Sequence, residues 1–175
     1  MTAFAFTSYV KVGENRYRER HGLDFEDFAV GQIFQHRPGL SISQQENAEE
    51  ALDTLNQAML HFDAQYASKT EWKQPLVVST LTLQRLLGMT WKTFGKRDRI
   101  LGWSEINMTR PVFGGDTLYA ESEIKAKQDV EGDPSRGRLT VITRGVNQKG
   151  EVVCSMEYDM LVYKRDSVPF EKASY

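Results

Sequence analysis

The chain has almost no cysteine and no long apolar run, and neither sign of charge dominates it. Its one cysteine, Cys154, excludes an internal disulfide framework and a metal site made of several cysteines. Apolar neighbours on both sides indicate that Cys154 is a buried core thiol. No apolar stretch reaches the roughly 18 residues that cross a bilayer. The first residues also lack the basic start and cleavage pattern of a signal peptide. The sequence therefore predicts a soluble cytoplasmic protein without a membrane partner.

Charge and composition exclude further classes. A net charge of -2 over 175 residues gives no electrostatic reason to expect a nucleic-acid partner. His21 and His36 stand in no recognisable pattern, and no metal-ligand spacing is present, so no metal site is expected. With 40% hydrophobic residues, the chain can build one ordinary core. We expect a single domain over residues 21–165, preceded by a charged extension, 1–20, and followed by a polar tail, 166–175.

The first helix is expected just after Ser43. Ser43 followed by Glu46 is a capping-box pattern, so a helix should run from about Gln44 to Leu55. Asn56 alone fits the left-handed residue that ends such a helix. His61 would then lie on a connecting loop, followed by one short helical turn at residues 63–67.

A second, more apolar helix is expected from about Pro75. Proline fits the first turn of a helix or the residue just before it. Apolar residues continue on nearly every side as far as Phe94, which predicts a helix buried on most faces, and Gly88 would allow a neighbour to pack closely. The basic residues that follow, Lys96, Arg97 and Arg99, are interpreted as a solvated loop, or as a contact for coenzyme A phosphates if such a ligand binds.

The rest of the chain is typical of strands. Leu118, Ala120, Ser122 and Ile124 alternate with charged or polar residues, which is the period of two that marks a half-buried strand. Three similar runs, 100–108, 139–143 and 152–163, are separated by glycine-containing turns. An earlier strand leads into a turn signal at Pro38–Gly39. One strand, two helices and four long strands predict an α+β hot-dog fold, in which an antiparallel sheet wraps around a central apolar helix.

Three segments resemble a known family. They are HFDAQYA at 61–67, PLVVSTLTL at 75–83 and LGWSEINMTRPVFGGDTLYAESEI at 101–124. Over about residues 24–163 the chain is similar to the MaoC-like hydratase/dehydratases, and most to their mesaconyl-CoA hydratase (β-methylmalyl-CoA dehydratase) branch. The resemblance implies a hydro-lyase, usually a homodimer or a dimer of dimers, that adds or removes water at a 2-enoyl-CoA thioester. Its acyl group would be a branched or dicarboxylic C4–C5 type. Coenzyme A would enter as part of the substrate, with no other cofactor.

The resemblance also assigns roles to residues. The family's catalytic His falls on His61 and its Asp on Asn56, which can orient water or the imidazole but cannot take a proton. The backbone N–H of Ser79, assisted by Thr80, would polarise the thioester carbonyl. Asp63 is a candidate acidic neighbour in the substrate site. The family's Asn and Pro between the two catalytic positions are replaced here by Ala58 and Met59.

Plainer interpretations of the same residues remain open. A lone histidine beside Phe62 is often a hydrogen-bonded structural residue, and Ser79 is otherwise a small polar residue in a helix. Two further functions fit the same scaffold: an acyl-CoA thioesterase, and a non-catalytic acyl-CoA-binding or partner subunit that has lost the full catalytic pair.

Overall fold

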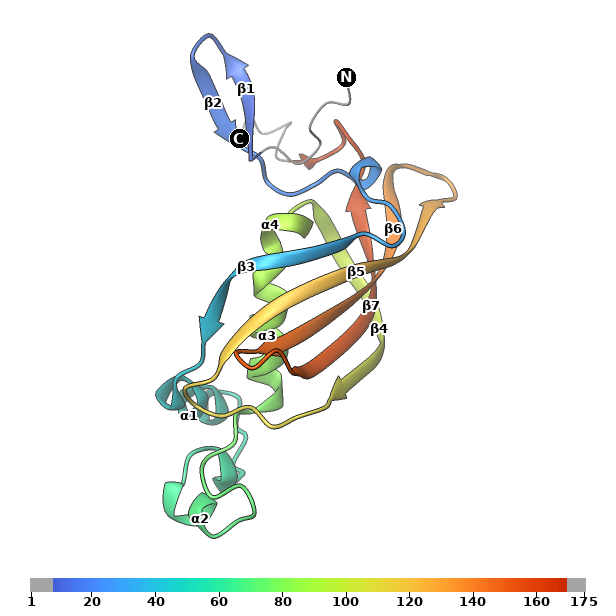
Figure 1. Ribbon diagram of the computed structural model, residues 1–175. Helices are drawn as coiled ribbons and strands as arrows, with labels where there is room; N and C mark the ends of the chain where they lie inside the picture. The colour runs from blue at the N-terminus through green and yellow to red at the C-terminus, as the bar shows by residue number, and fades with distance from the viewer. Residues whose placement is uncertain (1–7, 170–175) are drawn as a thin grey trace.

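A five-stranded antiparallel sheet curves around one helix, α3 (Ser79–Met89), in the computed structural model, which describes residues 8–169 (Figure 1). The strands lie in the order β3 (Ile33–Ser41), β5 (Thr117–Val130), β6 (Asp133–Asn147), β7 (Val152–Tyr163) and β4 (Arg97–Met108). This is the predicted α+β hot-dog fold. Residues 1–7 of the expected extension and 170–175 of the expected tail lie outside the described part.

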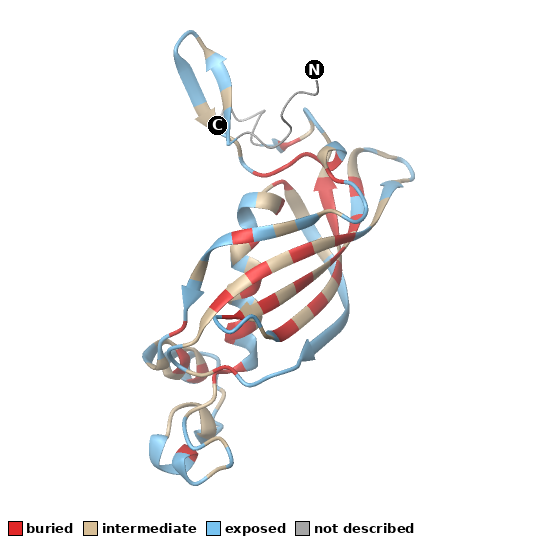
Figure 2. Ribbon diagram, in the orientation of Figure 1, coloured by how far each residue is buried: buried red, intermediate tan, exposed pale blue. Residues whose placement is uncertain are grey.

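The inner face of the sheet packs against α3. Along β5, β6 and β7, buried residues alternate with partly buried ones (Figure 2). The four β5 residues assigned to one face, Leu118, Ala120, Ser122 and Ile124, are all fully buried, which confirms the period-two pattern. Helix and sheet approach so closely that a side chain at Gly145 of β6 would collide with Leu86 of α3, its Cβ coming within 2.6 Å. Cys154 is fully buried as predicted, and burial raises the pKa of its thiol to about 11.

Helix α3 begins later than predicted. Leu76 forms an antiparallel bridge with Phe113, and the Val77 N–H donates to the Val112 carbonyl at 2.8 Å. The segment after Pro75 is therefore extended, and the helix begins only at Ser79. Thr80, Gln84 and Gly88 form one exposed stripe, and the helix residues from Leu81 on are otherwise buried or partly buried, as expected for a helix buried on most faces. Apart from Gly88 itself, its chain neighbours and the backbone of its own helix, no described atom lies within 4 Å of the position a Cβ would take at Gly88.

Helix α1 (Gln44–Asp53) ends two residues before the predicted end at Leu55. Leu55, not Asn56, has a positive φ of 59°. The Leu55 N–H donates to the Leu52 carbonyl at 3.1 Å and the Asn56 N–H to the Ala51 carbonyl at 2.8 Å. These two bonds form a Schellman motif, in which the left-handed residue is the one before Asn56.

Half of the expected capping box forms at the start of α1. The Ser43 hydroxyl accepts a hydrogen bond from the Glu46 N–H at 3.0 Å. The Glu46 carboxylate instead forms an ion pair with Arg85 of α3, so it ties the two helices together. The 3-10 helix η2 (Met59–His61) and helix α2 (Ala64–Ser68) follow, and all these elements lie at the end of the sheet where α3 begins (Figure 1).

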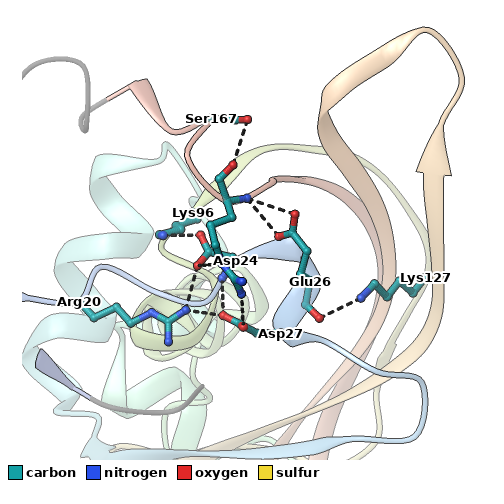
Figure 3. A network of polar contacts seen from close by, with 8 residues as sticks. Arg20, Asp24, Glu26, Asp27, Lys96, Lys127 and Ser167 are labelled. Atoms are coloured by element: carbon teal, nitrogen blue, oxygen red, sulfur yellow. Dashed lines mark hydrogen bonds and ion pairs between the residues drawn. The ribbon is translucent and has the colours of Figure 1, made fainter. Parts of the chain in front are cut away.

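Two further features differ from expectation. The turn expected at Pro38–Gly39 is an irregularity within β3, where the pairing with β5 shifts between His36 and Leu40 and the Arg37–Pro38 peptide is cis. Lys96 is only 6% exposed and forms an ion pair with the buried Asp24, so it does not belong to a solvated loop (Figure 3).

The remaining elements lie near the end of the sheet away from α1 (Figure 1). Arg97 and Arg99 are part of β4, and the short helix α4 (Trp91–Phe94) precedes it. Arg20 pairs with Asp24 and Asp27, the latter in the 3-10 helix η1 (Phe25–Asp27). Most of the described extension is a hairpin of β1 (Tyr9–Gly13) and β2 (Arg16–Glu19). None of the helices described between residues 8 and 169 combines the length and apolar character needed to cross a bilayer.

Candidate active site

His61 is fixed next to the segment that leads into the N-terminus of α3. It is the last residue of η2, and its Nδ1 lies 2.8 Å from the Leu76 carbonyl oxygen. A carbonyl oxygen only accepts hydrogen bonds, so in the neutral ring Nδ1 carries the proton and Nε2 keeps its lone pair. Because Leu76 is three residues before the start of α3, this bond places a potential proton acceptor beside the helix N-terminus.

Asn47 of α1, a residue that the sequence analysis missed, holds these segments together. Its fully buried amide donates from Nδ2 to the His61 and Leu76 carbonyls, each at 3.0 Å. Its Oδ1 accepts the Val78 N–H at 2.8 Å. The available signal was a polar residue one helical turn before Ala51, on the face that α1 buries.

A pocket of about 270 Å³ opens beside the first turn of α3. Its apolar lining includes Leu76 and Val112, and its polar lining includes Ser79, Thr82 and Arg110. The first amides of a helix have no partner within the helix, and they carry the positive end of its dipole. Ser79 is the first residue of α3, and no side chain caps this end, so its N–H can serve a polarised oxygen in the pocket.

Thr82, which the sequence analysis also missed, adds a second polar group. It is fully buried and lines the same pocket, and its Oγ1 has no hydrogen-bond partner among residues 8–169. A buried hydroxyl without a partner is destabilising, and its position in a pocket wall makes it suited to a hydrogen bond with a ligand.

The other predicted site residues have local structural bonds. The Asn56 side chain accepts the Ala58 N–H at 3.1 Å. Asp63 caps α2 by accepting the Gln65 and Tyr66 amides, each at 2.9 Å. Thr80 is exposed on the first turn of α3. Thus the structure brings His61 to the beginning of the helix that carries Ser79, while substrate contacts of Asn56, Asp63 and Thr80 stay predictions. No cluster of three or more metal-binding side chains is found between residues 8 and 169.

Comparison with known proteins places this chain in a family. The family model described as mesaconyl-CoA hydratase matches residues 4–173. The chain belongs to the mesaconyl-CoA hydratase family. It is 31% identical over 148 residues to mesaconyl-CoA hydratase from Cereibacter sphaeroides, an alignment that covers 83% of this chain and 43% of the relative. The chain spans less than half the length of the curated relatives it matches.

Solved structures of this family's fold agree with the architecture. A monoamine oxidase regulatory protein from Archaeoglobus fulgius is 28% identical, with a TM-score of 0.73 over 83% of this chain and 97% of that one. The Mycobacterium tuberculosis protein Rv0216, described as a double hotdog fold, is 20% identical with a TM-score of 0.73, and the match covers 83% of this chain and 45% of that one. The second likeness shows the fold alone, and it covers about half of that double hot-dog protein.

Proposed function

We propose that this chain forms the catalytic unit of an acyl-CoA hydratase/dehydratase, which adds water to a 2-enoyl-CoA thioester or removes it. The observation that carries the proposal is the imidazole of His61, whose Nδ1–H is bound to the Leu76 carbonyl and whose Nε2 is left as a base beside the α3 N-terminus. Membership of the mesaconyl-CoA hydratase family supports the same reaction.

The chemistry follows from these groups. As the oxygen of water bonds to the β-carbon, Nε2 of His61 takes its proton, and the electron pair of the double bond moves to the thioester oxygen. The Ser79 N–H, backed by the helix dipole, stabilises that oxygen; one such donor is typically worth roughly 3–4 kcal/mol in the transition state. The imidazolium then returns the proton to the α-carbon, so that water is added and His61 is regenerated. Asn56 is proposed to orient the water.

The acyl group is proposed to be mesaconyl or a similar C4–C5 group, with support from the names of the curated relatives. A cytoplasmic location likewise stays a prediction from the sequence.

We also infer that a second hot-dog unit lies along β4. This strand is an edge of the sheet, and every residue from 101 to 110 is exposed. Four of the exposed side chains are large and apolar: Leu101, Trp103, Ile106 and Met108. An edge with open hydrogen-bonding groups and apolar side chains is suited to pairing with another strand. The double length of the relatives supports a partner of this kind, either a second copy or a related chain, and sedimentation of the purified chain tests for a dimer or dimer of dimers.

Turnover tests the catalytic proposal. The purified chain, with its assembly measured, is mixed with mesaconyl-CoA, crotonyl-CoA or itaconyl-CoA, and the enoyl-thioester absorbance is followed. Substitution His61→Ala should lower kcat by about 100-fold or more, while the loss of one hydrogen bond costs only about 1 kcal/mol of unfolding free energy. His21→Ala, which removes an exposed histidine that lies beside Gly95 and not at the start of α3, is the control. Release of free thiol would indicate a thioesterase, and acyl-CoA binding without turnover a binding subunit; either result rejects the proposal.

A further inference from the structure

Among the described residues that line the pocket beside α3, Arg110 alone carries a charge. We propose that Arg110 determines substrate specificity by binding the free carboxylate of a dicarboxylic acyl group, an inference that rests on the proposed acyl-CoA site. The rest of the pocket wall is apolar or neutral, so it can hold a hydrocarbon chain but provides no other ionic partner for an anionic end.

The fold holds Arg110 in the wall of the pocket that Ser79 also lines. Thr109 and Arg110 donate their amides to the Val153 carbonyl of β7, at 2.9 and 3.3 Å, so the sheet holds this segment. Two residues after Arg110, this segment runs antiparallel to the residues that precede α3, with Leu76 opposite Phe113. Arg110 and Ser79 both line the pocket beside this pairing. The guanidinium therefore belongs to the same pocket as the residue whose N–H is proposed to bind the thioester oxygen.

The guanidinium group is available for a ligand. Its side chain is 55% exposed, and its paired anion, Glu151, is 3.6 Å away, a longer separation than a hydrogen bond. Glu151 is itself bound by the Asn147 side-chain amide at 3.0 Å. That hydrogen bond, and then the charge of Arg110, hold the pKa of the Glu151 carboxyl below its usual range, so it remains an anion at neutral pH. Arg110 is thus loosely held by one carboxylate and can exchange it for another.

Arginine suits this role chemically. Its planar guanidinium stays charged at all physiological pH values and presents parallel N–H donors that match both oxygens of a carboxylate. A neutral enoyl chain leaves those donors to water, whereas a dicarboxylic acyl group satisfies them. The same guanidinium could also meet a phosphate of coenzyme A, but that contact would be equal for every acyl-CoA. Comparing two acyl groups on the same carrier separates these sources of negative charge.

The experiment measures kcat/KM for mesaconyl-CoA relative to crotonyl-CoA. In Arg110→Gln this ratio should fall by roughly 10- to 100-fold, the range expected for a charged hydrogen-bonded pair. In Glu151→Gln the ratio should rise, because the competing carboxylate is removed. Lys149→Gln removes a neighbouring positive charge that does not line the pocket, and it should leave the ratio unchanged. An Arg110→Gln variant with an unchanged ratio, or with equal losses on both substrates, would overturn the proposal.

A binding measurement separates this proposal from the hydratase proposal. Calorimetry with succinyl-CoA and butyryl-CoA, neither of which can be hydrated, reports the preference for a carboxylate without turnover. If no enoyl-CoA reacts but Arg110→Gln selectively weakens succinyl-CoA binding, the hydratase proposal fails and the role of Arg110 is supported. If crotonyl-CoA is hydrated but the dicarboxylic preference does not depend on Arg110, the hydratase proposal stands and the role of Arg110 is rejected.

Discussion

The substitution Asn47→Ala tests whether one buried amide organises the site. The side chain is fully buried and joins α1 to the His61 and Leu76 carbonyls and to the Val78 N–H. After truncation, the two carbonyls keep other donors, since His61 O accepts Gln44 Nε2 at 2.7 Å and Leu76 O accepts His61 Nδ1–H at 2.8 Å. The Val78 N–H loses its bond to Oδ1, and no other acceptor for it is seen among residues 8–169. The cost should therefore be dominated by that one amide.

The magnitude follows from desolvation. A buried donor without a partner costs about 1–3 kcal/mol, and the space left by the amide adds to this, so we expect a loss of roughly 2–3 kcal/mol in unfolding free energy. For a chain of this length, that corresponds to a fall in Tm of roughly 5–10 °C. Because Val78 immediately precedes α3, the variant should also lose hydratase activity at temperatures where it is still folded.

Urea unfolding monitored by circular dichroism measures the effect, with activity assayed on the same samples. Gln45→Ala, on the exposed side of α1, is the matched control and should change stability by less than about 0.5 kcal/mol. Asn47→Asp keeps an acceptor for the Val78 N–H but sets a carboxylate oxygen against two carbonyls, so it should destabilise at neutral pH and less in acid. A loss below about 0.5 kcal/mol for Asn47→Ala, similar to the control, would refute the reasoning.

Two further predictions concern buried polar groups. Thr82→Val replaces the unpartnered hydroxyl by a methyl group of similar size, so it should raise the unfolding free energy by about 1 kcal/mol while lowering kcat/KM. Thermal unfolding measures the first effect and the hydration assay the second. A stabilised variant with full activity would show that the hydroxyl does not contact the substrate. Burial, and then the charge of Arg37, lower the pKa of His36 to about 4. Between about pH 6.5 and 4, His36 is therefore protonated in the unfolded chain but neutral in the folded chain. Stability should therefore be intact above pH 6.5 and fall by about 3 kcal/mol on acidification to pH 4. Urea titrations across this range measure that slope, which should be absent in His36→Gln; an equal slope there would assign it to other groups.

Local patterns in the chain predict much of the fold. The alternation in β5 and the order of strands and helices predict the hot-dog arrangement. Both features can be recognised from residues that are close together in the sequence. The start of α3 could not be obtained this way. Leu76 and Val77 are apolar enough for a helix, but their pairing with residues 112 and 113 keeps them extended. The extended conformation depends on a partner more than thirty positions away in the sequence, so local propensity does not predict it.

The site residues likewise differ in how far the sequence predicts them. His61 and Ser79 can be found from a short motif and a helix start, whereas Asn47 and Arg110 enter through contacts between distant segments. The error at Lys96 has a related cause. A lysine in a basic run is usually solvated, but Asp24, 72 positions earlier, is buried and requires a cation beside it (Figure 3).

The buried polar groups of the sheet show why Thr82 is informative. His36, Ser122, Thr143 and Tyr158 form a continuous row across β3, β5, β6 and β7, with links of 2.8, 2.7 and 3.0 Å. Every member of this row has a partner, so the core carries these polar atoms at little cost. Thr82 is the exception among the fully buried hydroxyls between residues 8 and 169, and it lies in the wall of the pocket that begins at Ser79. In a chain that satisfies its other fully buried hydroxyls, an open hydroxyl in a pocket wall is suited to a contact with a ligand. The unsatisfied hydroxyl therefore supports the proposal that a ligand binds in this pocket, independently of any resemblance to relatives.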